Sequence, residues 1–320
     1  MIRRYEPVDL SLVRRVAASE QAHRVELDHF SRGPVRVNRF IDALPKVLAA
    51  EELRSLVADI LAARRADRPV LLMMGGHVIK CGLAPVITSL MECRLVTAIA
   101  LNGAGSVHDC EIALLGHTSE DVASAMERGV FGMTAETGEF LNRSISRAAK
   151  EGLGLGEALG ADLQSAPHAK MSVLAAAHAF GCQATVHVAV GTDIHHMHPD
   201  ADGAALGAAA HTDFRLLAGV VRELRGGVVI NVGSAVILPQ VFEKALAVAR
   251  NTGSDVRNFT AANLDFIQLY RPGKSLLEKA RDLGGRAYAL TGHHEIMLPL
   301  IAWASIEGQS QPERRADAEP

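Results

Sequence analysis

The sequence predicts a doubly wound α/β fold, a mainly parallel sheet of about six strands with helices on both faces. Apolar runs of strand length alternate with helical segments along the 320 residues. The runs at 70–74 and 96–101 each stop at a glycine-bearing polar loop that a helix follows. Aromatic residues make up only 4% of the chain, while alanine, leucine, valine and glycine abound. This composition suits helices packed closely on a buried parallel sheet.

The individual elements follow from apolar periodicity, turn residues and helix caps. Helical periodicity runs from 39 to 65 with a soft break at Pro45, and Thr-Ser-Glu-Asp at 118–121 has the pattern of a helix cap. Gly-His-His-Glu at 292–295 opens the last helix. We expect strands at 70–74, 95–101, 184–190, 227–232, 266–269 and 287–290. We expect helices at 10–22, 39–65, 83–93, 109–115, 119–128, 134–149, 170–180, 212–224, 239–250 and 292–306.

The chain divides into three parts on this reading. Residues 1–66 form a helical and irregular segment that packs on the core, and 67–306 form the α/β domain. The tail at 307–320 is polar, so we expect it to be disordered. Residues 151–167 are punctuated by glycine and are interpreted as an insertion, a lid or an interface element.

Charge and cysteine usage exclude several classes of protein. The net charge is −3 and the charges are mixed along the chain, unlike a nucleic-acid-binding surface or a polybasic membrane anchor. No run approaches a membrane span of about 18–20 apolar residues, and the first ten residues lack the apolar core of a signal peptide. The four cysteines show no CxxC pair and no short disulfide framework. We therefore expect a reduced, cytoplasmic protein with a small-molecule substrate.

Two strand-end loops carry the clearest functional signal. In an open parallel sheet, ligands bind at the carboxyl ends of strands, where helix N-termini supply free N–H groups. Glycine lets the backbone approach a ligand closely. We therefore expect a phosphate-bearing or other polar small molecule that faces polar side chains of the loops at 75–82 and 102–109, namely His77, Lys80, Asn102, His108 and Asp109.

The second of these loops, Asn-Gly-Ala-Gly-Ser-Val-His-Asp, is a near match to the dinucleotide fingerprint GxGxxG. It has GxG after a strand, but His108 stands where the third glycine belongs. A tight strand-to-helix turn is the alternative reading. Gly233-Ser234 after the strand at 227–232 also offers backbone N–H groups to a ligand, without the GxSxG context of a serine hydrolase.

Histidines gather in two further segments. The loop at 191–207 contains Asp193, His195, His196, His198, Asp200 and Asp202. These side chains either contact substrate, bind a zinc-like ion or lie in solvent. His293 and His294 stand at a helix N-terminus, which favours a neutral imidazole that acts as a base or donor. Lys80 and Lys274 are the lysines expected in a site.

Taken in order, these loops resemble the deoxyhypusine synthase family, over about residues 68–304. MMGGHVIKCG stands where that family has a Thr-Ser-Asn loop, and LNGAGSVHD stands where it has Thr-Thr-Ala-Gly-Gly and an acidic pair. The segment 202–207 corresponds to its Asp-Gly-Ser-Ile-Gly-Asp loop, and INVGSAV to a strand that ends in a glycine cluster. GHHEIMLPLI corresponds to its Ala-Asp-Ala turn and following helix. The resemblance implies a Rossmann-like fold that binds NAD, and an active site between the subunits of a homodimer or homotetramer.

The departures from this family concern its catalytic groups. The family's lysine lies in Trp-Gly-Lys, which is absent here; Trp303 is in the last helix, and Lys274 and Lys279 only lie in the corresponding region. Its Pro-Lys-His-His is replaced by residues 237–240, and its polyamine-binding acidic stretch retains only Asp265. The NAD-binding residues are thus retained in outline, whereas the polyamine and imine machinery is not, and deoxyhypusine is not the expected product.

We therefore expect an NAD-dependent transferase or oxidoreductase that oxidises an alcohol or amine carbon of a small substrate, with or without group transfer. The expected catalytic residues are His293, His294, Lys274, Asp193 and His195. The expected cofactor residues are Gly75, Gly76, His77, Asn102, Gly103, Ala104, Gly105, Asp109, Asp202, Gly203, Gly233, Ser234 and Glu295. The expected substrate residues are Lys80, His108, His196, His198 and Asp265. One alternative is a metal-dependent hydrolase or lyase with His195, His198 and Asp193 as ligands, and another is a non-catalytic ligand-binding protein.

Overall fold

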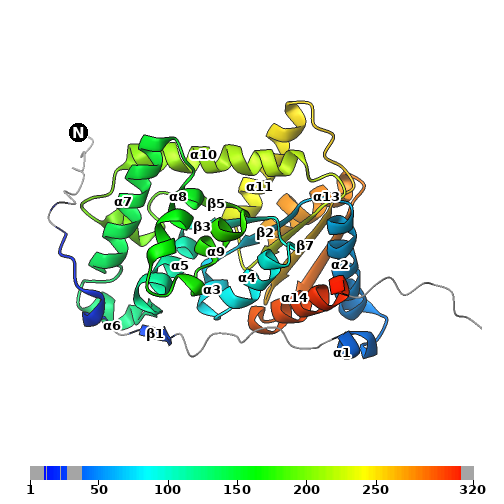
Figure 1. Ribbon diagram of the computed structural model, residues 1–320, viewed down its shortest axis with the longest axis horizontal. Helices are drawn as coiled ribbons and strands as arrows, with labels where there is room; N and C mark the ends of the chain where they lie inside the picture. The colour runs from blue at the N-terminus through cyan, green and yellow to red at the C-terminus, as the bar shows by residue number, and fades with distance from the viewer. Residues whose placement is uncertain (1–10, 12, 22, 27–37, 311–320) are drawn as a thin grey trace, which may run out of the picture.

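The computed structural model describes residues 11, 13–21, 23–26 and 38–310 of the chain. Its centre is a six-stranded, all-parallel sheet with the strand order β5-β3-β2-β6-β7-β8 (Figure 1). The strands are β2 (Val70–Met74), β3 (Ala98–Asn102), β5 (Gln183–His187), β6 (Val228–Val232), β7 (Thr260–Asp265) and β8 (Arg286–Thr291). The predicted doubly wound α/β fold is therefore confirmed.

The strand order defines where a ligand is expected to bind. The chain moves outward from β2 through β3 to β5, then returns to the other side of β2 and continues through β6 and β7 to β8. Met74, the last residue of β2, pairs with Leu101 of β3 and with Val232 of β6. The connections reverse direction between β2 and β6, and ligands of such sheets bind at the carboxyl ends beside this switch point.

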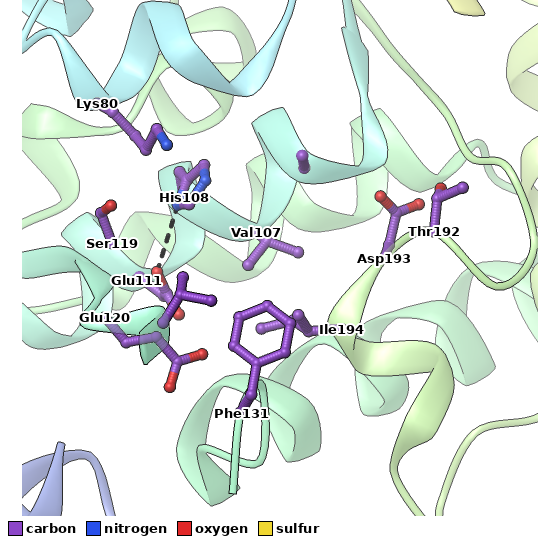
Figure 2. Close-up of a pocket in the computed structure, with 12 residues that line it drawn as sticks. Lys80, Val107, His108, Glu111, Ser119, Glu120, Phe131, Thr192, Asp193 and Ile194 are labelled. Carbon is purple, nitrogen blue, oxygen red and sulfur yellow. Dashed lines mark ion pairs between the residues drawn. The ribbon is translucent and has the colours of Figure 1, made fainter. Parts of the chain in front are cut away.

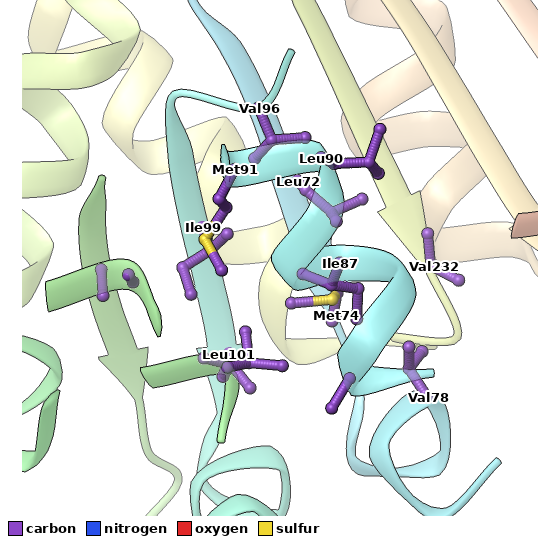
Figure 3. Close-up of a cluster of buried hydrophobic side chains, with 14 of the residues drawn as sticks. Leu72, Met74, Val78, Ile87, Leu90, Met91, Val96, Ile99, Leu101 and Val232 are labelled. Atoms are coloured by element: carbon purple, nitrogen blue, oxygen red, sulfur yellow. The ribbon is translucent and has the colours of Figure 1, made fainter. Parts of the chain in front are cut away.

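Helices cover both faces of the sheet and enclose two cores (Figure 1). Leu72 and Met74 of β2 point into the first core (Figure 3), while Leu71 and Met73 point into the second, because side chains alternate along a strand. Burial on both faces explains why β2 reads as an unbroken apolar run. The first core is covered by α2 (Leu48–Arg65), α4 (Ala84–Glu92), α8 (Leu155–Asp162), α9 (Val173–Phe180) and α14 (His294–Ser310). The second is covered by α10 (Gly203–Arg222), α11 (Ile237–Asn251) and α13 (Glu278–Asp282).

The remaining elements are shorter or lie at the edges. The α-helices among them are α1 (Asn38–Ala43), α3 (Gly76–Lys80), α5 (Gly103–Leu115), α6 (Val122–Glu127), α7 (Ala135–Glu151) and α12 (Tyr270–Pro272). The 3-10 turns are η2 (Ala18–Glu20), η4 (Leu163–Ser165), η5 (Ala169–Met171) and η6 (Ile194–Met197), and η7 (Gly273–Leu277) is a π-helical turn. A second, two-stranded sheet pairs β1 (His23–Glu26) with β4 (His117–Glu120). No helix within the described residues has the length and apolar character of a membrane span.

The two strand-end segments expected to be loops are mostly helical. Helix α5 begins directly after β3, because the side chain of Asn102 accepts a hydrogen bond from the Gly105 amide at 2.9 Å and caps the helix. Helix α3 likewise begins at Gly76. Of the segment expected to cap a helix at 118–121, residues 118–120 belong to β4, which pairs antiparallel with β1, and Asp121 directly precedes α6. The ligand-facing segments are therefore helix N-termini and one short strand.

The strand expected at 266–269 is wrong, since β7 ends at Asp265 and Phe266 is 56% exposed. The sequence of β7, Thr-Ala-Ala-Asn-Leu-Asp, is not recognisable as a buried strand because three of its six residues are polar. Inside the sheet the amide of Asn231 donates to Asn263 Oδ1 at 2.7 Å, which pairs these two buried side chains.

Four other expectations need correction. Of the helix expected at 10–22, the described residues form only η2 and a bridge from Val16 to Thr134. Residues 151–167 contain the buried helix α8 rather than a lid, and a Cβ on Gly156 would lie 2.5 Å from the Ala184 carbonyl oxygen. Helix α10 begins at Gly203, nine residues before the expected start. Of the expected disordered tail, 307–310 continue α14 and 311–320 lie outside the described residues.

Candidate functional site

A pocket of about 240 Å³ lies beside the carboxyl ends of β2 and β3 (Figure 2). Helices α3 and α5, strand β4 and the segment before η6 form its walls. Its polar lining consists of Lys80, His108, Glu111, Ser119, Glu120, Thr192 and Asp193. Its apolar lining consists of Ala104, Val107, Val122, Phe131 and Ile194. The pocket thus combines acid–base groups with an aliphatic wall.

His108 is held by a short chain of hydrogen bonds. The Nδ1 of His108 lies 2.7 Å from the hydroxyl of Thr118, and that hydroxyl donates to the buried carboxylate of Glu111. Because a hydroxyl has one proton to give and Thr118 gives it to Glu111, His108 must donate its Nδ1–H to Thr118. The imidazole is therefore fixed in the tautomer that leaves the Nε2 lone pair free to accept a proton.

Glu120 and Asp193 supply two further carboxylates to the pocket lining. Glu120 Oε1 accepts from the Gly132 amide at 2.8 Å, while no described group donates to its buried Oε2. Burial raises the pKa of Glu120. Burial also raises the pKa of Asp193, to about 6, against hydrogen bonds from the backbone that lower it. Asp193 lies over the N-terminus of α5, where a Cβ on Gly103 would collide with its carboxylate.

A second polar cluster lies at the carboxyl ends of β6, β7 and β8. His294 is buried, its Nε2 donates to the Leu264 carbonyl oxygen at 3.3 Å, and its ring lies 5.8 Å from that of His77, edge to face. Asp265 Oδ1 lies 3.9 Å from His294, and Glu295 Oε2 lies 3.7 Å from the Cys81 sulfur. Burial lowers the pKa of His77, and the charges of Lys80 and His294 lower it further. His77 and Lys80 share helix α3, so this cluster adjoins the pocket.

The glycines at the strand ends pack against the chain itself. A Cβ on Gly75 would lie 2.2 Å from the Gly233 carbonyl oxygen, and one on Gly76 would lie 3.0 Å from the His108 ring. Gly233 has a φ of +63° and lies against the ring of His294. These positions need glycine for close approach of protein atoms. At the ends of β2 and β6, Gly75 therefore packs against Gly233, and Gly233 against His294.

The three histidines of the loop before α10 lie mostly inside the protein. His195 is fully buried, and neither ring nitrogen has a described hydrogen-bond partner. Burial lowers its pKa to about 3, with smaller effects of His196 and His198. His198 Nε2 donates to the Gly132 carbonyl oxygen at 2.9 Å, and His196 Nδ1 accepts from the Gly191 amide at 3.2 Å. Within the described residues, no three His, Cys, Asp or Glu side chains are grouped to hold a metal ion.

Several other residues expected in the site stabilise helices or lie in solvent. Asp109 is fully buried and accepts from the Ser172 hydroxyl and from two amides at the start of α9. Asp202 caps α10, and Ser234 accepts from an amide at the start of α11. Lys274 is exposed and paired with Glu278 at 2.7 Å. Of the expected residues, the pocket therefore brings together Lys80, Ala104, His108 and Asp193. Asp109, Asp202, Ser234 and Lys274 do not line it.

Four residues in or behind the pocket are not among those expected from the sequence: Glu111, Thr118, Glu120 and Phe131. Glu111 lies three residues after His108 on one helix, a spacing that places two side chains on the same face. The expected helix at 109–115 began one residue after His108, so this spacing became recognisable only with the observed start of α5 at Gly103. Thr118 and Glu120 come to the pocket only through the pairing of β4 with β1, for which the local sequence gives no signal.

No family model matches the chain, and no curated protein matches it. Solved structures share its fold at low identity. The ternary complex of AgrE with ornithine and NAD+ has a TM-score of 0.51 and 15% identity, over 82% of this chain and 33% of that chain. A candidate LOR/SDH protein of Methanococcus maripaludis S2 has a TM-score of 0.47 and 14% identity, over 87% and 73%. A candidate deoxyhypusine synthase of Entamoeba histolytica has a TM-score of 0.47 and 12% identity, over 85% and 95%. The chain thus spans about a third of the AgrE chain, and the likeness is one of overall fold.

Proposed function

We propose that the protein is an NAD-dependent enzyme that oxidises the carbon bearing an alcohol or amine in a small substrate. The observation that carries this proposal is the fixed tautomer of His108, with a free Nε2 in a pocket at the carboxyl end of a doubly wound sheet. Oxidation of such a carbon needs a group that accepts the proton of the hydroxyl or amine as the hydride leaves, and His108 fits that role.

The chain of hydrogen bonds behind His108 supports the proton transfer. When Nε2 takes the proton of the substrate, the imidazole becomes positively charged. The carboxylate of Glu111 lies 3.5 Å from Nδ1 and accepts the Thr118 hydroxyl, so it stabilises that charge and keeps the ring oriented. Glu111 and Thr118 are therefore positioning residues, and His108 is the catalytic base.

The cofactor is inferred from the fold and from the side chains that lie near the switch point of the sheet. The strand order is that of dinucleotide-binding sheets, and AgrE, which shares the fold, was solved with ornithine and NAD+. Because His294 and the glycines pack against one another at the ends of β2 and β6, the exposed side chains of His77, His293 and Glu295 are the groups we assign to cofactor contact. NAD supplies a hydride acceptor when bound; the substrate leaves as a carbonyl compound or an imine, and its proton stays on His108.

Thermal unfolding with and without NAD tests the proposal first. A ligand at about 100 times its Kd stabilises a protein by about 2.7 kcal/mol, which is a rise in Tm of several degrees at this size. The variant His108→Gln should keep this rise, because His108 is not assigned to the cofactor.

Substrate-dependent NADH formation is the second readout. His108→Gln should lose about 10²–10⁴-fold of the rate, whereas His178→Gln, an exposed histidine on α9, should not change it. An unchanged Tm at millimolar NAD would contradict the proposal and favour a non-catalytic ligand-binding protein.

A further inference from the structure

We propose that the substrate is an α-amino acid with a short aliphatic side chain that ends in an amine. This inference rests on the proposed function in assigning the pocket of His108 to the substrate. Its independent basis is that Lys80 forms no ion pair with a described residue, and that one buried carboxylate oxygen of Glu120 and one of Asp193 accept no hydrogen bond from a described group.

The positive group is Lys80. It lies at the end of α3, it is half-buried, and it forms neither an ion pair nor a hydrogen bond with the part of the chain that is described. In Figure 2 its ammonium group points toward His108. An ammonium group in a partly desolvated pocket is stabilised by an anion. The carboxylate of a substrate, held beside His108, meets this requirement.

The two negative groups are Glu120 and Asp193. The Oε2 of Glu120 and the Oδ2 of Asp193 are buried, and neither accepts a hydrogen bond from a described group. The nearest histidine nitrogen to Asp193, His196 Nε2, is 4.0 Å away. A buried carboxylate oxygen without a donor costs free energy. Each is therefore a site for one ammonium group of a ligand.

Glu111 does not add a third such site, because its carboxylate already accepts the Thr118 hydroxyl. The complement of the pocket is thus one carboxylate and two ammonium groups. A diamine without a carboxylate would leave Lys80 unpaired, and an amino acid without a second amine would leave one carboxylate unpaired.

The apolar lining separates the charged groups. In Figure 2, Glu120 and Asp193 lie on opposite sides of Val107, with Phe131 and Ile194 between them. A short aliphatic chain fits this lining. A volume of about 240 Å³ corresponds to roughly eight water molecules at about 30 Å³ each, so the pocket suits a small molecule.

Calorimetric titration without NAD tests the inference with three probes of similar length. L-Ornithine carries all three charges, 1,4-diaminobutane lacks the carboxylate, and L-norvaline lacks the distal amine. We expect L-ornithine to bind at least about tenfold more tightly than either of the others, because each missing charge leaves a buried partner unpaired. Equal binding of 1,4-diaminobutane would overturn the inference in favour of a polyamine site, and no binding of L-ornithine would overturn it outright.

Variants of the pocket identify which side chain binds which charged group of the ligand. Lys80→Met should abolish the preference for L-ornithine over 1,4-diaminobutane, and Asp193→Asn its preference over L-norvaline. Glu120→Gln provides a second carboxylate variant should Asp193→Asn fail to fold. Matched controls are Lys244→Met and Asp255→Asn, both exposed and outside the pocket, which should leave both preferences unchanged. Retention of both preferences in Lys80→Met and in the carboxylate variants would overturn the inference.

The two proposals fail in different ways. A rise in Tm with NAD but no amino-acid binding would overturn the inference and leave the redox function standing. Amino-acid binding with the expected preferences, but no effect of NAD on Tm, would support the substrate class and overturn the redox function.

Discussion

Gly75 provides a direct test of why glycine stands at the end of β2. A Cβ at this position would lie 2.2 Å from the carbonyl oxygen of Gly233, whereas ordinary contact begins near 3.4 Å. The overlap involves backbone on both sides, so no rotamer change relieves it. The Gly75 amide also donates to the Val232 carbonyl oxygen at 3.0 Å, and a backbone shift that relieves the overlap would weaken this hydrogen bond. In the variant Gly75→Ala the ends of β2 and β6 must separate.

The expected cost is about 3 kcal/mol, from overpacking of about 1–3 kcal/mol and a weakened hydrogen bond of about 1 kcal/mol. An unfolding entropy of about 2.1 cal/mol/K per residue gives about 0.7 kcal/mol/K for this chain, so Tm should fall by about 4–5 °C. Differential scanning calorimetry measures this directly. The matched control is Gly207→Ala, an exposed position inside α10 with no atom within 4 Å of the new Cβ, which should gain about 0.5–1 kcal/mol. A Tm of Gly75→Ala equal to that of the wild type would refute the packing argument.

Two further substitutions test groups beside and beneath the site. Burial raises the pKa of Asp213 from 3.8 to about 7, so its contribution to stability is full below about pH 4 and is lost as pH rises through about 7. In urea titrations, the unfolding free energy of the wild type should therefore fall by about 4 kcal/mol over that range relative to the variant Asp213→Asn. Parallel pH profiles of the wild type and the variant would contradict this. Glu111→Gln should lower kcat by about 10²-fold with little change in KM, since the residue stabilises the protonated base and does not bind substrate; a change confined to KM would place Glu111 in substrate binding instead.

The sheet was predictable because buried parallel strands are unbroken apolar runs. β2 was predicted to the residue, and β6 to within one residue at its start. β7 was not, since Asn263 reads as polar until its partner Asn231 on the neighbouring strand is known. A strand whose polar side chains form hydrogen bonds with a neighbouring strand cannot be recognised from its own sequence. The same argument explains β4, which depends on pairing with β1, about 90 residues away in the sequence.

The residues of the candidate site fall into the same two groups, those with a signal in the local sequence and those brought in by tertiary pairing. Lys80, His108 and Asp193 were predicted because each follows a recognisable strand at the carboxyl edge of the sheet. Thr118 and Glu120 were not, because they reach the pocket from β4, whose segment has the composition of a helix cap. Sequence reasoning therefore located the edge of the sheet that binds ligand, but not the residues that tertiary pairing brings to it.

The glycines and histidines that first attract attention have different physical roles from those their sequence pattern indicates. Gly75, Gly103 and Gly233 are required because the backbone or a side chain of the same protein lies against each of them. A glycine-rich strand end thus permits close packing within the chain as readily as it permits close approach of a ligand. What separates the two cases is the identity of the nearest atom, which only the tertiary structure supplies. The groups with unmet electrostatic requirements, Lys80 and Asp193, are consequently better guides to the ligand than the glycine pattern beside them.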